Sequence, residues 1–231
     1  TMDIPRGVIL EPPNLPHWRD FPIRDRLAEA CGQQVYYAND AGAAASGEYW
    51  IGSGREFYSI VMLTLGPGVG GGLIVGDLSI DGENSHGSEC GNIIIDSSDA
   101  ARVCSCGQKG HLEGYASATA LIQRTREALE AGQPSSLRSR VEAGEELSGL
   151  ALAEEAEAGD ALALRLILET ADYLVIGIVT LIHTIDPGAV ILGGAMNFGG
   201  EGSAVGSRFL DRIREGVRGK AFPVPAAHVQ I

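Results

Sequence analysis

The chain has 231 residues, 45% of them hydrophobic and 20% charged, which is enough for one large domain or two lobes with a core. Its formal net charge of −13 excludes a broad basic surface, so we expect no nucleic-acid partner. The most apolar run, residues 173–185, is shorter than the about 20 residues that a membrane-spanning helix needs. The first six residues lack the apolar core of a signal peptide, so we expect a cytoplasmic protein without a membrane partner.

The first elements surround one aspartate. Three prolines make residues 11–18 an irregular loop, and a helix is predicted over 23–30 with a short strand over 35–38. Asp40 stands between that strand and an alanine-rich helix. Two interpretations are open: Asp40 caps the helix, or its carboxylate lies at the C-terminal edge of a strand, where α/β proteins bind ligands. The local sequence favours the cap.

A glycine-rich stretch spans residues 64–72. The apolar run 59–65 leads into it and the apolar run 73–75 follows it, so the pattern predicts two strands joined by a glycine loop. Five of the seven residues 66–72 are glycine. Glycine allows close approach to the backbone, and several exposed N–H groups can bind an anion. The alternative is an ordinary hairpin turn, which needs only one or two glycines. We favour the approach of a phosphate or another ligand. Neither the P-loop pattern nor the dinucleotide fingerprint is present.

Two cysteines and a histidine lie within eight residues, at Cys104, Cys106 and His111. Two thiolates and an imidazole can form a three-ligand zinc site. The alternative is a loop with incidental free cysteines, which we consider the weaker interpretation. A fourth ligand is not evident, and Cys90 and Asn92 are the nearest candidates.

The second half predicts alternating helices and strands, which indicates an α/β fold. Ser117 and Asp160 are expected to cap two of its helices. The predicted segments are helices from 117 to about 131, over 147–158, from 161 to about 184 and over 203–218, a charged irregular region over 134–144, and strands over 190–192 and near 229.

Six segments resemble, in this order, motifs of the ROK family (repressors, open reading frames and sugar kinases), of the glucokinase type. They are Pro13-Asn14-Leu15-Pro16 with Trp18, Asn39-Asp40-Ala41, the glycine stretch 64–72, the segments 88–92 and 104–113, and Asp186-Pro187 with Gly193-Gly194. The resemblance implies an actin-like ATPase, ribonuclease-H-like fold with two lobes and a ligand cleft. Residues 1–38 would be the remainder of the N-terminal lobe, and residues 39–231 the C-terminal lobe with a zinc-binding loop at about 89–113.

The same resemblance implies an ATP-dependent kinase that phosphorylates the 6-hydroxyl of glucose or a related aldohexose. Asp40 would be the catalytic base, and Mg²⁺ would accompany ATP. The expected sugar-binding residues are Asn39, Glu89, Asn92 and Glu113. The expected nucleotide-binding residues are Gly66, Gly68, Gly70, Gly71, Gly193 and Gly194. A structural Zn²⁺ would be held by Cys104, Cys106 and His111.

The sequence departs from the family pattern at several points. Asn92 replaces a histidine that ligates zinc and touches sugar, and Pro67 replaces a threonine of the phosphate loop. The family's opening Asp-x-Gly-x-Thr segment is absent, so we expect that much of the N-terminal lobe is missing. Two alternatives to the kinase stay open: a sugar-sensing repressor of the same family and a non-catalytic sugar-binding remnant. The resemblance also suggests a homodimer.

Overall fold

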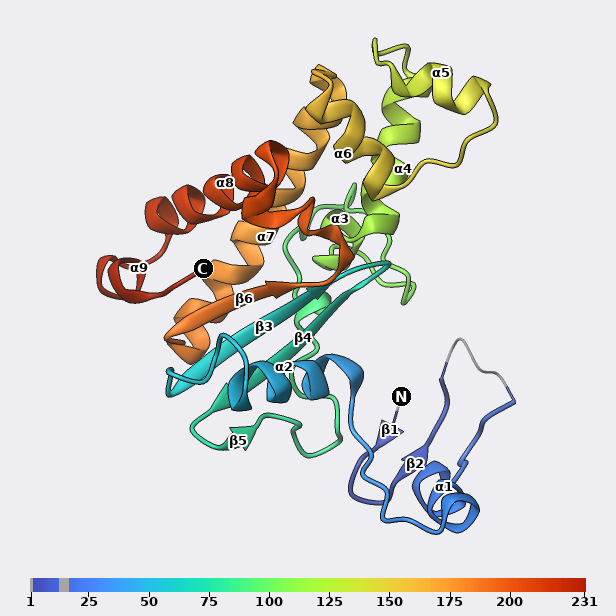
Figure 1. The fold of residues 1–231 in the computed structure, drawn as a ribbon, viewed down its shortest axis with the longest axis vertical. Coiled ribbons are helices and arrows are strands. Elements are labelled where there is room, and N and C mark those ends of the chain that lie inside the picture. The colour runs from blue at the N-terminus through green and yellow to red at the C-terminus, as the bar shows by residue number, and fades with distance from the viewer. Residues whose placement is uncertain (1, 13–16) are drawn as a thin grey trace.

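The computed structural model describes residues 2–12 and 17–231, and its centre is a four-stranded sheet with the strand order β5-β4-β3-β6 (Figure 1). β3 (Ser59–Leu65) and β4 (Val69–Val75) form an antiparallel hairpin, and β5 (Leu78–Ser79) continues it. β6 (Ala189–Gly193) lies parallel to β3 after a long helical crossover. This mixed arrangement confirms the predicted α/β class.

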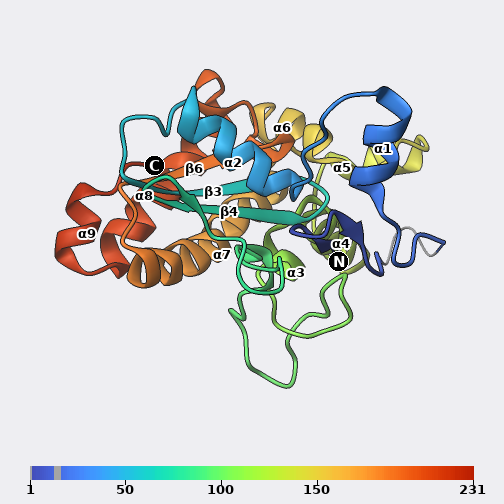
Figure 2. The same ribbon diagram turned by 90° about the horizontal axis from the view of Figure 1, so that it is seen from below.

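β3 is buried on both faces, which explains its nearly continuous apolar sequence. Val61, Leu63 and Leu65 belong to the main hydrophobic core, together with residues of the long helix α7 (Ala161–Ile185). The alternate residues Ile60 and Met62 pack in a second cluster with Ala45 of α2 (Asp40–Trp50). Figure 2 shows the resulting layers, with α2 on one face of the sheet and α7 on the other.

The helix α7 has 25 residues, and both of its ends agree with the sequence analysis. Asp160 caps it by accepting a hydrogen bond from the Ala163 N–H at 2.8 Å. At the other end, Asp186 takes the left-handed conformation with φ 51°. No helix in the described part of the chain combines the length and apolarity that crossing a membrane requires.

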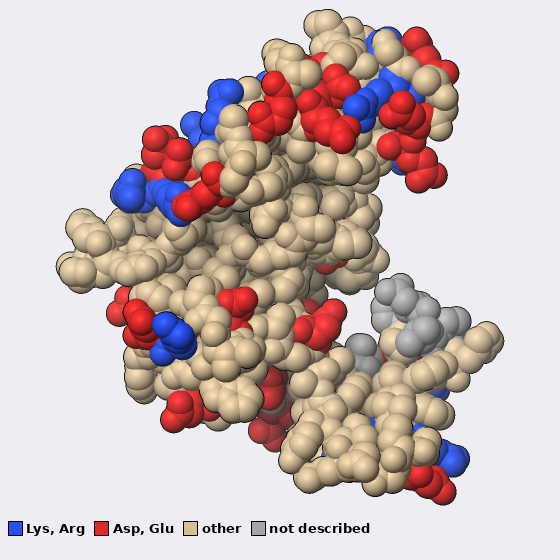
Figure 3. Space-filling model, viewed as in Figure 1, with Lys and Arg blue, Asp and Glu red and all other residues tan. Residues whose placement is uncertain are grey.

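The remaining helices surround α7 and the sheet. Two of them have serine caps: the Ser117 hydroxyl accepts a hydrogen bond from the Ala120 N–H at the start of α4 (Ala118–Glu130), and the Ser203 hydroxyl accepts one from the Gly206 N–H at the start of α8 (Ala204–Lys220). The others are α3 (Glu113–Ala116), α5 (Leu137–Glu142), α6 (Gly149–Glu157) and α9 (Pro223–His228), with the short 3₁₀ turns η1 (Cys90–Asn92), η2 (Ala195–Asn197) and η3 (Gly200–Gly202). Acidic and basic residues intermingle over the upper helices in Figure 3, and that face has no continuous basic area.

A small N-terminal unit is joined to the beginning of α2 (Figure 1). β1 (Met2–Asp3) and β2 (Val8–Ile9) form a hairpin, followed by α1 (Ile23–Cys31). Gly32 ends α1 in the left-handed conformation, with φ 62°, which glycine adopts easily. The motif at residues 13–16 lies outside the described residues.

Three predicted elements are wrong. Residues 35–38 form no strand, because the described residues offer them no pairing partner and Tyr36 is 84% exposed. The region 134–144 contains α5, which is anchored by the fully buried Leu137. Near Val229 a single bridge joins Gln230 to β6, and the helix α9, which we did not predict, precedes it.

Candidate active site

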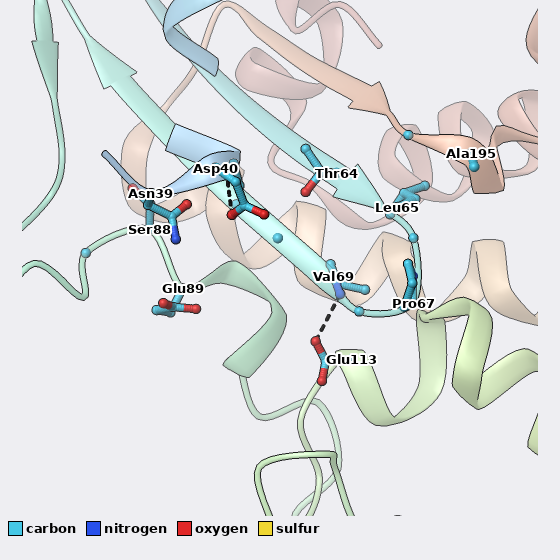
Figure 4. A pocket seen from close by; sticks show the side chains of 17 residues that line it. Asn39, Asp40, Thr64, Leu65, Pro67, Val69, Ser88, Glu89, Glu113 and Ala195 are labelled. Atoms are coloured by element: carbon cyan, nitrogen blue, oxygen red, sulfur yellow. Dashed lines mark hydrogen bonds between the residues drawn. The ribbon is translucent and has the colours of Figure 1, made fainter. Parts of the chain in front are cut away.

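A cavity of about 440 Å³ opens where the turn between β3 and β4 meets the first residues of α2 and the loops before η1 and α3 (Figure 4). Most of the predicted site residues line it, namely Asn39, Asp40, Gly66, Gly68, Gly70, Gly71, Glu89, Glu113 and Gly194. Asn92, Gly193 and the three predicted zinc ligands are not among the lining residues. The fold thus brings together segments that range from residue 39 to residue 195 of the chain.

Asn39, not Asp40, caps α2. The Asn39 Oδ1 accepts a hydrogen bond from the Gly42 N–H at 3.0 Å, and its extended backbone precedes the helix. Asp40 is the first helical residue, where its Oδ1 accepts a bond from the Ala41 N–H at 2.8 Å. The cap interpretation of Asp40 is therefore wrong. Its carboxylate lies in the pocket at the positive end of the helix dipole, which favours a negative charge there.

The glycine stretch is mostly strand, because β4 begins at Val69 and the turn consists of Gly66, Pro67 and Gly68. Gly70 and Gly72 face α2. A Cβ on Gly72 would lie 2.3 Å from the Ala45 Cβ, closer than atoms can pack. Close internal packing therefore explains this part of the stretch.

Gly71 faces the opposite side of β4, where a Cβ would lie 2.4 Å from the Cys90 Sγ. Gly66 has no atom within 4 Å of such a position. It is therefore the glycine of the turn with free space beside it, and approach of a ligand to the turn remains a prediction.

Glu113 links the turn to the cysteine-containing loop. Its Oε2 accepts a hydrogen bond from the Val69 N–H at 3.0 Å, drawn in Figure 4. Its Oε1 accepts hydrogen bonds from the Ser105 hydroxyl and, at 3.5 Å, from the Cys104 thiol. The sequence analysis missed Ser105 because a serine between two candidate metal ligands carries no signal of its own.

Ser88 fixes the loop that carries Glu89. The Ser88 hydroxyl accepts a bond from the Leu73 N–H at 3.2 Å and donates one to the Ile80 carbonyl at 2.8 Å. Glu89 lies on the same side of the pocket as Asn39 in Figure 4. The sequence analysis did not identify this role of Ser88, because it depends on the approach of the loop to β4.

The pocket is acidic, since Asp40, Glu89 and Glu113 line it and its lining within residues 2–12 and 17–231 includes no lysine or arginine. Carboxylates and an amide suit the hydroxyl groups of a neutral polyol. A phosphate here would depend on backbone N–H groups and an accompanying cation.

The predicted metal ligands do gather in one place. Cys104, Cys106 and His111 have donor atoms within 4.8 Å of one another, and the Cys106 Sγ lies 3.2 Å from the His111 Nδ1. Cys90 is not part of the group and packs against Gly71. Burial raises the pKa of the Cys90 thiol to about 12.

The ROK family model matches residues 2–229, which is nearly the whole chain. The chain belongs to the ROK family. It is 34% identical over 201 residues to a glucokinase from Thermotoga maritima, covering 87% of this chain and 63% of the relative. It is 31% identical over 225 residues to a putative xylose repressor from Caldicellulosiruptor sp., covering 97% of this chain and 54% of that relative. This ROK chain thus spans between half and two thirds of the length of these curated relatives.

Solved structures of ROK proteins share the fold. A ROK hexokinase from Thermus thermophilus matches with a TM-score of 0.77 and 32% identity, over 99% of this chain and 69% of that chain. A ROK glucokinase from Streptomyces griseus, solved with glucose and AMPPNP, matches with 0.78 and 30% identity, over 97% and 70%. A ROK transcriptional regulator, a homolog of the E. coli MLC protein, matches with 0.84 and 26% identity, over 99% and 55%. The predicted actin-like ATPase fold is confirmed.

Proposed function

We propose that this ROK chain is the catalytic part of an ATP-dependent kinase that phosphorylates the 6-hydroxyl of glucose or a related aldohexose. The observation that carries the proposal is the position of Asp40, an exposed carboxylate at the start of α2 in a pocket with Glu89 and Glu113. Glucokinases among the relatives, and the Streptomyces griseus structure with glucose and AMPPNP, support it.

In this proposal the sugar lies among Asn39, Glu89 and Glu113, with its 6-hydroxyl at Asp40. Asp40 accepts the hydroxyl proton as the oxygen attacks the γ-phosphorus, and the bond from that phosphorus to the leaving ADP oxygen breaks. Asn92 lies outside the pocket, so we leave it out of the sugar-binding set.

ATP would enter as its Mg²⁺ complex, because the lining residues include no cationic side chain to offset the phosphate charge. In this proposal the nucleotide lies next to the backbone of three glycines, namely Gly66 and Gly68 of the turn and Gly194 after β6. Gly70 and Gly71 could contribute only backbone atoms, because neighbouring residues fill the space beside their Cα atoms.

We further infer that Zn²⁺ binds at Cys104, Cys106 and His111, whose donor set and spacing suit it. A bound ion would hold the loop from which Ser105 reaches Glu113, so its role would be structural. A homodimer and a cytoplasmic location complete the proposal, on the family resemblance alone.

A sugar-sensing repressor is the second candidate. It is favoured by the Caldicellulosiruptor xylose repressor, which matches 97% of the chain, and by the regulator structure with a TM-score of 0.84. The two candidates differ in a measurable way, because a repressor binds sugar without consuming ATP and releases or binds operator DNA in response.

The test is ADP release with Mg-ATP over a panel of aldohexoses and N-acetylhexosamines, using the complete product of the gene that encodes this chain. Turnover on one sugar is the expected result. Asp40→Asn should reduce turnover on the order of 10²- to 10⁴-fold with sugar binding retained in calorimetry. Asp211→Asn, an exposed change on α8 away from the pocket, is the matched control and should leave turnover unchanged.

Unchanged turnover in Asp40→Asn would contradict the role of this carboxylate. Sugar binding without any turnover would favour the repressor. If the protein shows neither turnover nor sugar binding, the third hypothesis, a non-catalytic sugar-binding remnant, is contradicted as well.

A further inference from the structure

The group formed by Cys104, Cys106 and His111 has the spacing of a zinc site. The Cys106 Sγ and His111 Nδ1 are 3.2 Å apart, and all three donors lie within 4.8 Å of one another. With Zn–S near 2.3 Å and Zn–N near 2.0 Å, sulfur and nitrogen ligands of a tetrahedral ion lie about 3.5 Å apart. The donors therefore need only small shifts to hold one ion.

The backbone of the loop forms this arrangement by itself. The Cys104 N–H donates to the Gln108 carbonyl at 2.7 Å, and the Gly107 N–H donates to the Cys104 carbonyl at 2.9 Å. Gly107 has φ 86°, which closes the turn between the two cysteines and the histidine. His111 is held by a bridge to Ile94. The loop is thus preorganised for the ion.

A fourth protein donor is missing from the group. In the described parts of the chain, no further histidine, cysteine or carboxylate has an atom close enough to all three donors to join them. Cys90 is turned towards Gly71 of the hairpin. Glu113 contacts Cys104 through Oε1 at 3.5 Å, but it does not lie within reach of all three donors, and its Oε2 is held by the Val69 N–H. Asn92 is exposed and offers only an amide, which is a weak zinc ligand.

The group also opens to solvent on one side. Cys104 is buried and His111 is half-buried, whereas Cys106 is exposed. An ion held here would have three protein donors and one position open to solvent, as in zinc sites that exchange a ligand. Zinc is a borderline-soft ion, and thiolates and imidazoles are ligands that it accepts readily.

We propose that Cys104, Cys106 and His111 form an open three-donor zinc site whose fourth position takes an exchangeable small thiolate or imidazole. The proposal rests on the zinc binding inferred above but is independent of kinase activity. Asn92 does not complete the coordination shell. The ion is therefore held in a site that a small ligand can reach, in a loop that also orients Glu113 through Ser105.

The experiment uses Co²⁺ as the probe, because its visible absorption reports the ligands around it. Metal-free protein is titrated with Co²⁺ alone, and 2-mercaptoethanol or imidazole is then added. We expect one bound Co²⁺ per chain, a thiolate-to-metal charge-transfer band, and a clear change of the visible bands when either ligand is added. Cys106→Ser should remove about half of the charge-transfer absorption, because Cys104 remains as a thiolate donor, whereas Cys31→Ser, at an exposed cysteine on α1, should leave the absorption unchanged.

Two variants of one exposed residue decide the coordination number. Asn92→Ala should keep the Co²⁺ affinity within about twofold, and Asn92→His should raise it roughly 10- to 100-fold and abolish the spectral response to added ligand. Circular dichroism checks that both variants fold.

A tenfold loss of affinity in Asn92→Ala, a wild-type spectrum that ignores both ligands, or no Co²⁺ binding would overturn the proposal. None of these readouts depends on turnover. A protein without kinase activity but with the expected spectra would therefore contradict the proposed function and leave the open site standing.

Discussion

The packing of α2 against β4 can be tested with one methyl group. Gly72→Ala would place a Cβ 2.3 Å from the Ala45 Cβ and 2.9 Å from the Ala41 carbonyl oxygen. The second of these atoms belongs to the helix backbone, so no side-chain rotation relieves the clash. The whole helix α2 would have to move away from the sheet.

The expected loss of stability follows from two opposing terms. Overpacking of a filled core costs typically about 1–3 kcal/mol, and a backbone contact points to the upper half of that range. Alanine is better than glycine in a strand by about 0.5–1 kcal/mol, which offsets part of the cost. The net loss for Gly72→Ala is about 2 kcal/mol, which for a protein of this size lowers Tm by about 4–8 °C.

The assay is urea unfolding followed by circular dichroism, with Gly219→Ala as the matched control. Gly219 lies in α8, and an added Cβ there meets nothing within 4 Å. Alanine is the better helix former, so the control should gain up to about 1 kcal/mol. The same chemical change is thus expected to act in opposite directions at the two sites.

A second variant identifies the clash. Adding Ala45→Gly to Gly72→Ala removes the 2.3 Å contact, so the two changes should couple by about 1 kcal/mol or more in a double-mutant cycle. A loss below about 0.5 kcal/mol for Gly72→Ala alone, or strictly additive effects, would refute the packing argument.

Three further predictions concern other parts of the ROK chain. The Tyr115 hydroxyl donates a hydrogen bond to Asp96 at 2.6 Å and lowers the pKa of that carboxyl in the folded protein. This hydrogen bond therefore stabilises the fold at pH values above the pKa of Asp96 in the unfolded chain. The stabilisation is lost as the pH falls through the lower pKa of the folded state. The stability gap between wild type and Tyr115→Phe, measured in urea, should therefore be largest at neutral pH and shrink in acid; a constant gap would contradict this. Because its pKa is raised to about 12, Cys90 has a thiolate fraction roughly a thousandfold below that of an ordinary cysteine. Iodoacetamide at mildly alkaline pH should therefore label the exposed Cys31 and leave Cys90 unlabelled in the native protein. Peptide mass mapping measures the labelling of each cysteine. Ser117→Ala removes the cap of α4 and should cost about 1 kcal/mol in the same urea assay, whereas no loss would mean that the cap bond does not contribute.

The sequence alone predicted the elements whose signals are local. The helix α7 was predictable because a capping aspartate precedes a long apolar pattern. The strand β3 was predictable because it is buried on both faces and therefore reads as a continuous apolar run. Motif order gave the family, and with it the expectation that Asp40 and Glu89 share a pocket.

Other features depend on contacts between distant segments, and only the tertiary structure decided them. Residues 35–38 have strand-like composition but find no pairing strand in the part of the chain that the structure describes, and a strand exists only when another strand shares its hydrogen bonds. Gly72 lies in a strand and packs against α2. The sequence does not show this, because the space beside a glycine depends on which element packs there. The hydroxyl of Ser105 reaches Glu113 only after the loop between them has folded. A sequence specifies which side chains are available, whereas their distances from one another arise when the whole chain has packed.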